Sequence, residues 1–199
     1  MQIKLFIHIA LIILLLIAEP LKSFSQSATV PININVNGTL TISDALNDAS
    51  SGKNPTLNVN LSITPDLGAA AASGQANFRI RTNRSTWKLT AQRTAETDTG
   101  PTNIQASDIS LLVTTFAGSN GNAMAGTLVA PFNTSTQLSS ISTTAPVDVV
   151  TGTSKTSIAR DSTNGNNYFQ VNTLYSILPD FFFQPGTWAT TITYNLVSP

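Results

Sequence analysis

The sequence predicts an all-β protein built as an antiparallel β-sandwich. Apolar and polar side chains alternate along several short segments, turn-forming residues separate these segments, and helical periodicity is not found. Seven or more short strands with frequent turns are typical of an immunoglobulin-like sandwich, with a closed barrel as the main alternative. We expect a single such domain over residues 26–199.

The first alternating segment runs from Val30 to Val36 and is followed by Asn37-Gly38. Asn-Gly is the strongest short signal for a hairpin, so this segment is expected to fold back on a strand that begins near Leu40. Alternatively, the segment is a donor strand that completes the sheet of a neighbouring subunit, as in pilins. Pro31 suits an edge or first strand position because it lacks an N–H group.

The later strands are expected from apolar residues at every second position. The polar turn Thr82–Ser85 predicts a hairpin between the strands that contain Phe78 and Trp87. Residues 109–116 are apolar on both faces at Leu111-Leu112, which predicts a central strand that is covered on both faces. The other predicted strands cover residues 57–63, 169–177 and 188–196.

The first 25 residues have the order of a secretory signal peptide. Lys4 supplies a positive start, Leu5 to Ala18 is an uncharged run, and Ser23 and Ser25 stand at the two small-residue positions. The run is too short to span a bilayer comfortably, since that takes about 20 residues. We therefore expect cleavage after Ser25 and a secreted or cell-surface protein with no membrane span in the mature chain.

The mature chain lacks the side chains of many catalytic and metal sites. The one histidine, His8, lies in the leader, and the chain has no cysteine. Their loss excludes Ser-His-Asp and Cys-His catalysis and zinc sites built on His or Cys. Lys4, Lys22 and Glu19 also leave, so eight basic and nine acidic residues remain, which gives no long-range attraction to nucleic acid. We predict a non-catalytic protein without a cofactor or metal.

A secreted hydrolase that uses carboxylates is the alternative from another functional class. It would need two acidic groups across a cleft, and no spacing singles out two among Asp66, Asp98, Asp108, Asp148 and Asp180. Asp161–Asn167 resembles a calcium loop. Its glycine falls one position early and no Glu follows at the twelfth position, so we expect a polar loop.

Basic residues gather along the predicted hairpin at Arg79, Arg81, Arg84 and Lys88. Arg79, Arg81 and Lys88 are expected to share its outward face. Such a face could hold a polyanion such as a wall phosphate polymer, because Arg makes bidentate contacts. The alternative is a solvated outer face that discourages edge pairing.

The aromatic residues give two further expectations. Trp87 and Trp188 lie on the apolar phase of their strands, which predicts core positions rather than platforms for sugar rings. Phe181-Phe182-Phe183 precedes Pro185. A strand that faces the core accounts for two of these rings, and the third is expected at a sheet corner or on a partner surface.

Two short strings resemble the WxL domain of bacterial cell-surface proteins. Trp87-Lys88-Leu89 matches the Trp-x-Leu strand of that family, and the C-terminal string matches its second aromatic strand at Trp188, Ile192, Tyr194 and Leu196. The resemblance implies that these residues are the structural signature of a non-catalytic β domain. It implies non-covalent association with the cell wall of Gram-positive bacteria. The expected partners are a cell-wall or envelope polymer or other surface proteins, and self-association is possible.

Overall fold

A computed structural model describes residues 30–199, and residues 37–199 form one compact unit. The predicted leader and its cleavage point lie outside the described residues. Within the described part, the structure is all-β with antiparallel strands, and its sheets have free edges and do not close on themselves. This result confirms the sandwich prediction over the closed alternative. No helix in residues 30–199 has the length and apolar character needed to cross a bilayer.

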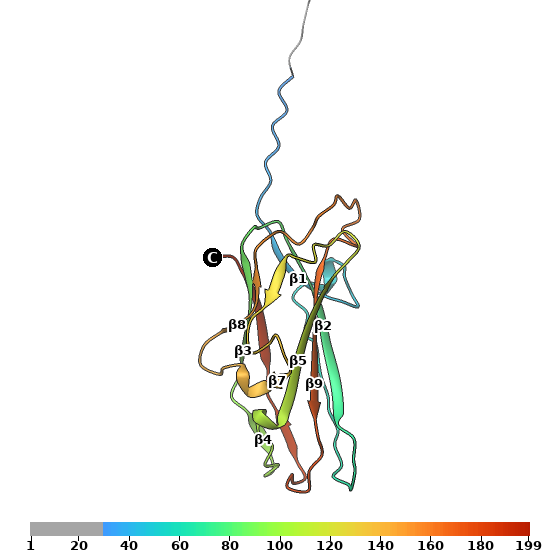
Figure 1. The fold of residues 1–199 in the computed structure, drawn as a ribbon, viewed down its shortest axis with the longest axis vertical. Coiled ribbons are helices and arrows are strands. Elements are labelled where there is room, and N and C mark those ends of the chain that lie inside the picture. Colours follow the sequence, from blue (N-terminus) through green and yellow to red (C-terminus); the bar gives the residue numbers. More distant parts are fainter. Residues whose placement is uncertain (1–29) are drawn as a thin grey trace, which may run out of the picture. The chain divides into compact units, whose positions relative to one another are not determined.

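One layer of residues 37–199 is a five-stranded sheet in the order β1-β2-β9-β5-β7. The central β9 pairs along its whole length with β2 on one side and β5 on the other (Figure 1). These strands are β1 (Leu40–Asp44), β2 (Ala72–Thr82), β5 (Ile109–Ala117), β7 (Thr136–Gln137) and β9 (Phe169–Ile177).

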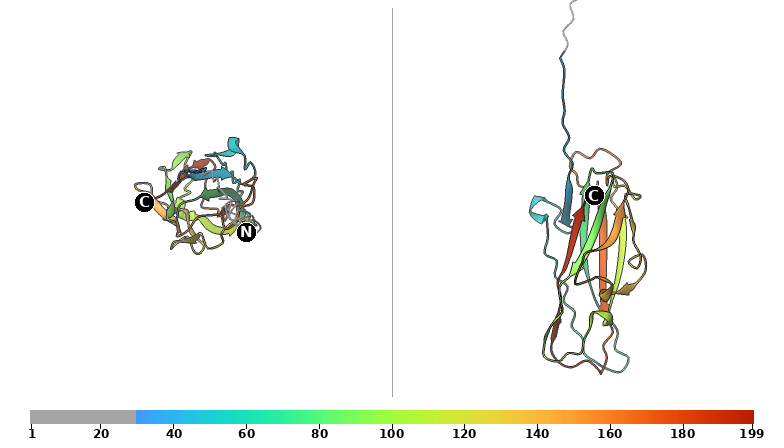
Figure 2. Two further views of the ribbon diagram at one scale, coloured as in Figure 1. Left: turned by 90° about the horizontal axis from the view of Figure 1, so that it is seen from above. Right: turned by 90° about the vertical axis from the view of Figure 1, so that its left-hand side faces the viewer.

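The second layer is a four-stranded sheet in the order β11-β3-β8-β6, and a separate two-stranded sheet pairs β10 with β4. Figure 2 shows the domain from its end and from its side. The strands are β3 (Trp87–Arg93), β4 (Thr97–Thr99), β6 (Gly126–Leu128), β8 (Val147–Gly152), β10 (Thr187–Ala189) and β11 (Ile192–Val197). Three short 3-10 helices are η1 (Ser50–Gly52), η2 (Ala106–Asp108) and η3 (Leu138–Ser140).

The core lies between the two layers, with Trp87 as its largest fully buried side chain. The indole ring meets Phe169 edge-on at a centroid distance of 5.9 Å, and its Nε1 donates to the Ser154 carbonyl at 2.8 Å. Gly126 and Gly152 face the ring closely, and a Cβ at Gly152 would overlap it. The slot for this tryptophan therefore depends on glycine in two paired strands.

The hairpin predicted at Thr82–Ser85 is wrong, because β2 and β3 belong to different sheets. The segment carries the chain from one layer to the other, so Ile80 and Leu89 meet the same core from opposite sides. The Asn83 side chain bonds the backbone of residues 37 and 39 rather than closing a turn on itself. The alternating pattern predicts which side chains point inward. It does not predict which sheet a strand joins, because both sheets enclose the same core.

The hairpin predicted at Asn37-Gly38 is also wrong. A type I′ turn needs positive φ at both central residues, and neither residue has it. Gly38 instead lies against the Arg84 guanidinium, where a Cβ would clash. Residues 30–36 belong to no strand, and their four apolar side chains are 77–82% exposed.

Three other strand predictions need correction. Residues 57–63 keep their alternation, with apolar side chains half-buried against the core, but they form no strand. The segment 109–116 is not covered on both faces, because Leu112 and Phe116 are 37% and 45% exposed. The predicted final strand 188–196 divides at residues 190–191 into β10 and β11, which lie in different sheets.

Candidate functional site

The outer face of the five-stranded sheet carries an ordered set of polar and aromatic side chains, which we call the outer platform. Its members are Gln75, Asn77, Arg79 and Arg81 on β2, Gln170, Asn172 and Leu174 on β9, Leu112, Thr114 and Phe116 on β5, and Tyr168 just before β9. The register places Arg79, Gln170 and Phe116 in one row across the three strands. Side chains in such rows are close enough to act together.

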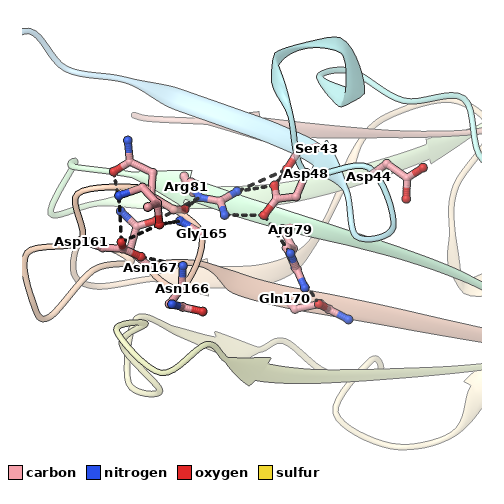
Figure 3. Close-up of polar contacts among 12 residues, drawn as sticks. Ser43, Asp44, Asp48, Arg79, Arg81, Asp161, Gly165, Asn166, Asn167 and Gln170 are labelled. Atoms are coloured by element: carbon pink, nitrogen blue, oxygen red, sulfur yellow. Dashed lines mark hydrogen bonds and ion pairs between the residues drawn. The ribbon is translucent and has the colours of Figure 1, made fainter.

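Two arginines of β2 are held flat on this face by one carboxylate (Figure 3). Arg79 Nη1 lies 2.8 Å from Asp48 Oδ2, and Arg81 Nη1 lies 2.6 Å from Asp48 Oδ1. Ser43 Oγ donates to the same Asp48 oxygen at 2.6 Å. Asp48 comes from the loop between β1 and η1, so the ion pairs fasten this loop to the sheet.

The Asp48 carboxyl stays ionised over the ordinary pH range. Burial by itself raises the pKa of this group, but hydrogen bonds from Arg81, Ser43 and Arg79 outweigh it and lower the pKa from 3.8 to about 2. The carboxylate is 14% exposed. One negative charge therefore sits between two positive ones, and the cluster keeps a single net positive charge.

Aromatic rings border the arginine cluster. The Arg79 guanidinium lies over the Tyr168 ring, with its Cζ 3.9 Å from the ring centroid. This distance is well within the range of a cation–π contact. Tyr168 in turn meets Phe116 edge-on at a centroid distance of 6.1 Å. Phe116 is the more accessible ring, at 45% exposure.

A chain of amide hydrogen bonds continues from the arginine along β9. Arg79 Nε donates to Gln170 Oε1 at 3.1 Å, and Gln170 Nε2 donates to Asn172 Oδ1 at 2.7 Å. Asn77, across from Asn172, donates to Gln75 and keeps a buried Oδ1 without a hydrogen-bond partner among the described residues. Gln170 is only 7% exposed, so this chain of hydrogen bonds orients the half-buried amide of Asn172, which can both donate to and accept from a ligand.

The structure divides the four predicted basic binding residues. Arg79 and Arg81 lie together on the outer platform, while Arg84 lies in the crossover against Gly38. Lys88 is on β3, in the other sheet, and pairs with Asp148 at 2.6 Å. The expectation that Arg79, Arg81 and Lys88 share one face is therefore wrong, because it depended on the β2–β3 hairpin.

The residues of the WxL-like strings contribute to the interior in different ways. Trp87 and Leu89 are fully buried, while Ile192, Tyr194 and Leu196 are half-buried and pack against the core. The Tyr194 hydroxyl lies 3.1 Å from that of Tyr175, and burial raises the pKa of both phenols.

Trp188, the last residue of this set, is half-buried rather than fully enclosed. It packs against the core from β10, and its Nε1 donates to Glu96 at 3.3 Å. The prediction of a core position holds in full for Trp87 and in part for Trp188.

The candidate carboxylates all take part in local structure. Asp148 pairs with Lys88, and the others accept hydrogen bonds from nearby backbone or hydroxyl groups: Asp66 from Leu67, Asp98 from Thr102, Asp108 from Gln105 and Asp180 from Phe182. In the Asp161 loop, backbone N–H groups of Asn166 and Thr163 lower the pKa of the Asp161 carboxyl. Residues 30–199 hold no group of three or more acidic, His or Cys side chains placed for a metal ion.

The three consecutive phenylalanines follow β9 in a loop and not in a strand. Phe183 is half-buried against the core, whereas Phe181 and Phe182 are 74% and 67% exposed. The expectation of two core rings and one outer ring is thus reversed. In a loop, consecutive side chains need not alternate between two faces as they do in a strand.

Sequence reasoning missed most of the outer platform. The strand 169–177 was predicted from its apolar residues at every second position. Gln170 and Asn172 occupy the positions between them, so the same alternation places their side chains on the outer face. No sequence signal connects Asp48 or Tyr168 with the arginines of β2, because the chain separation between them is long. No family model and no curated protein matches this chain.

Proposed function

We propose that this protein is a non-catalytic, exported surface protein that binds a hydroxyl-rich polymer of the cell wall or envelope on its outer platform. The observation that supports this most is the hydrogen-bonded row from Arg79 through the buried Gln170 to Asn172, beside the exposed Phe116 ring. Tyr168 lies between them, with Arg79 over one face of its ring. Amides bind hydroxyl groups, and aromatic faces suit the apolar faces of sugar rings. This combination suits a glycan chain laid across three strands.

The leader pattern supports export, and the WxL-like strings support association with a wall. Non-covalent attachment fits this proposal, because it needs only a binding face. A binding role also agrees with the use of the carboxylates in turns, caps and ion pairs rather than in an acid-base pair. The secreted hydrolase has no comparable feature in its favour.

The charge of the platform favours a neutral or weakly anionic glycan over a dense polyanion. Asp48 neutralises one of the two arginines, and Lys88 lies in the other sheet. Tight binding of a polyanion usually draws on several unpaired cations on one face. Binding to the preferred polymer is therefore expected to change little with salt concentration, since few ion pairs form.

The platform is tested with matched substitutions on the two outer faces. Phe116→Ala and Asn172→Ala remove an exposed ring and an amide from the platform. Val197→Ala and Asn195→Ala make comparable changes on β11, in the other sheet. We expect each platform variant to weaken binding about tenfold, which corresponds to about 1.4 kcal/mol.

Binding is measured by co-sedimentation of residues 26–199 with insoluble peptidoglycan and with a neutral polysaccharide, at low and high salt. Unchanged binding in both platform variants, or an equal loss in the β11 variants, would contradict the proposed surface. Binding that disappears at high salt would instead indicate a polyanion. Hydrolysis of either polymer would overturn the non-catalytic assignment.

A structural subunit that assembles by strand exchange is the second candidate function. One observation favours it, namely the exposure of the apolar side chains between Val30 and Val36.

A further inference from the structure

Residues 30–36, which we call the donor segment, have the pattern of a strand without a sheet. Val30, Ile32, Ile34 and Val36 occupy every second position, and each is at least 77% exposed. Within residues 30–36 themselves, no backbone group is hydrogen-bonded to another. Large exposed apolar side chains in such a regular row indicate a surface that another molecule covers.

The domain of residues 37–199 has an edge that such a strand fits, which we call the seam. It lies between β1, at the edge of one sheet, and β11, at the edge of the other. The right-hand view of Figure 2 shows β1 in blue beside β11 in dark red. The two strands are in contact but share no backbone ladder. β11 pairs with β3 on one side only, so its other edge offers unpaired N–H and C=O groups to an added strand. The free edge of β1 is partly occupied, because Ser43 bridges Lys53 and Asn54 N–H donates to the Ile42 carbonyl.

The seam is also incompletely covered. The inward residues of β11, namely Ile192, Tyr194 and Leu196, are only half-buried. On β3, the residues paired with Leu196 and Tyr194, namely Leu89 and Ala91, are fully enclosed. Leu40 and Ile42 of β1 face Tyr194 and Leu196 across an open hollow of about 160 Å³, which Asn54 and Asn195 also line. The apolar part of this hollow is a surface against which side chains of an added strand can pack.

We infer that the donor segment of one copy adds as an edge strand to β11 of a second copy and covers the seam. The seven-residue segment matches the six residues of β11 in length. Its period-2 pattern places all four apolar side chains on one face, toward the seam, and leaves Asn33 and Asn35 outward. Thr193 and Asn195 of β11 are polar and outward in the same way. Backbone hydrogen bonds between the added segment and β11 would supply the affinity. The four apolar side chains would fix the register, because a shift by one residue would turn them toward solvent.

The arrangement around residue 38 favours a second copy over the same chain. A fold-back onto the chain's own seam needs a reversal at Asn37-Gly38, and these residues lack the φ values of a tight hairpin turn. The Asn83 side chain also holds the Asn37 carbonyl and the Thr39 N–H, both at 2.8 Å. A donor on one copy and an acceptor edge on the next make a head-to-tail contact, which extends into a chain of subunits unless it closes into a ring.

The first test compares two variants of the mature chain that carry the same added charge. Ile32→Asp places a carboxylate on the apolar face of the donor segment, and Asn33→Asp places one on its polar face. Neither change touches the folded core, since residues 30–36 are exposed. Using size-exclusion chromatography with light scattering over a wide range of concentration, we expect concentration-dependent association in the native chain. Ile32→Asp should weaken it about a hundredfold, and Asn33→Asp little.

The second test locates the acceptor edge. Because the chain has no cysteine, an Asn35→Cys chain can be mixed with chains that carry Thr193→Cys, Asn195→Cys or Val197→Cys on β11. Neighbouring strands bring such pairs within disulfide reach in at least one register. Thr127→Cys on β6, at the opposite edge of the same sheet, is the control. We expect cross-linked dimers with β11 and not with β6.

Three results would overturn the inference. The native chain could stay monomeric at all concentrations, or Ile32→Asp and Asn33→Asp could associate equally well. A chain that carries both Asn35→Cys and Asn195→Cys could also form its disulfide within a monomer, which would show that the segment covers its own seam. These results are independent of polymer binding on the outer platform, which lies on the outer face of β2, β9 and β5 and does not include β11.

Discussion

Replacing Trp87 by Ala is expected to lower the free energy of unfolding by about 3–5 kcal/mol, the range for deleting a large buried aromatic side chain. The ring is 1% exposed, contacts Phe169 and donates to the Ser154 carbonyl. Its removal leaves a cavity between the sheets, and the part-buried Ser154 carbonyl loses its hydrogen bond from the indole. The measurement is urea unfolding of residues 26–199, extrapolated to zero denaturant.

Trp188→Ala is the matched control for this change. Its ring is half-buried, and its hydrogen bond to Glu96 is exposed, so the loss should be clearly smaller. Gly152→Ala tests the same slot from the other side, because the added methyl group would overlap the indole. Overpacking of this kind costs about 1–3 kcal/mol. Equal losses for the two tryptophans would contradict the assignment of Trp87 as the centre of the core.

Replacing Asp48 by Asn is expected to destabilise the fold by about 3 kcal/mol. The substitution leaves Arg79 and Arg81 side by side without the negative charge that they share. Removing one partner of a buried ion pair lowers the free energy of unfolding by about 3–5 kcal/mol. We choose the low end of this range because the arginines are about one-fifth exposed. Thermal unfolding at pH 7 measures the effect.

The contribution of Asp48 should also depend on pH in a defined window. Its pKa is about 2 in the folded protein and 3.8 in the reference state. A lowered pKa means that the stabilisation is complete above about pH 4 and is lost as the pH falls toward 2. The shift corresponds to about 2 kcal/mol. The difference in stability between the native chain and Asp48→Asn should therefore narrow over that window.

Asp148→Asn is the control for Asp48→Asn, since Asp148 also pairs with a basic residue. That pair is more exposed, with Lys88 at 40% and Asp148 at 36%, so its loss should cost less than about 1 kcal/mol. Two results would contradict a stabilising role for the Asp48 ion pairs. The two Asp variants could lose the same free energy of unfolding, or the difference in free energy between the native chain and Asp48→Asn could stay constant down to pH 2.

Two of these variants, Asp48→Asn and Gly152→Ala, also test the proposed function. Asp48 orients Arg79, and Arg79 starts the hydrogen-bonded row that runs along β9. Trp87 lies in the interior, away from the platform surface. Asp48→Asn is therefore expected to weaken polymer binding under conditions where the variant remains folded, whereas a folded Gly152→Ala variant should bind normally.

Alternation predicted the strands well where each strand is paired and packed on one face. Residues 78–81, 87–92 and 169–177 alternate as expected, and their inward side chains form the core. Residues 57–63 show the limit of the pattern, because the same alternation there buries side chains without any strand pairing. Side-chain burial and the backbone ladder are separate interactions, and the apolar pattern reports only the first.

The candidate site was less accessible to sequence reasoning than the core. Arg79 and Arg81 were identified from their local density, but Lys88 was joined to them by a hairpin that does not form. Asp48 and Tyr168 meet the arginines only because β1, β2 and β9 are neighbours in one sheet. Such contacts depend on strand order, which has no local signature.

The amino-acid pattern alone predicted an all-β protein and the side chains that point inward along most strands, and it shows that residues 26–199 contain no His or Cys. Which strands share a sheet, and where Asp48 meets its arginines, follow only from the folded arrangement. A period-2 pattern distinguishes inside from outside and nothing more. Both layers enclose the same interior, so long-range packing must select the partner of each strand.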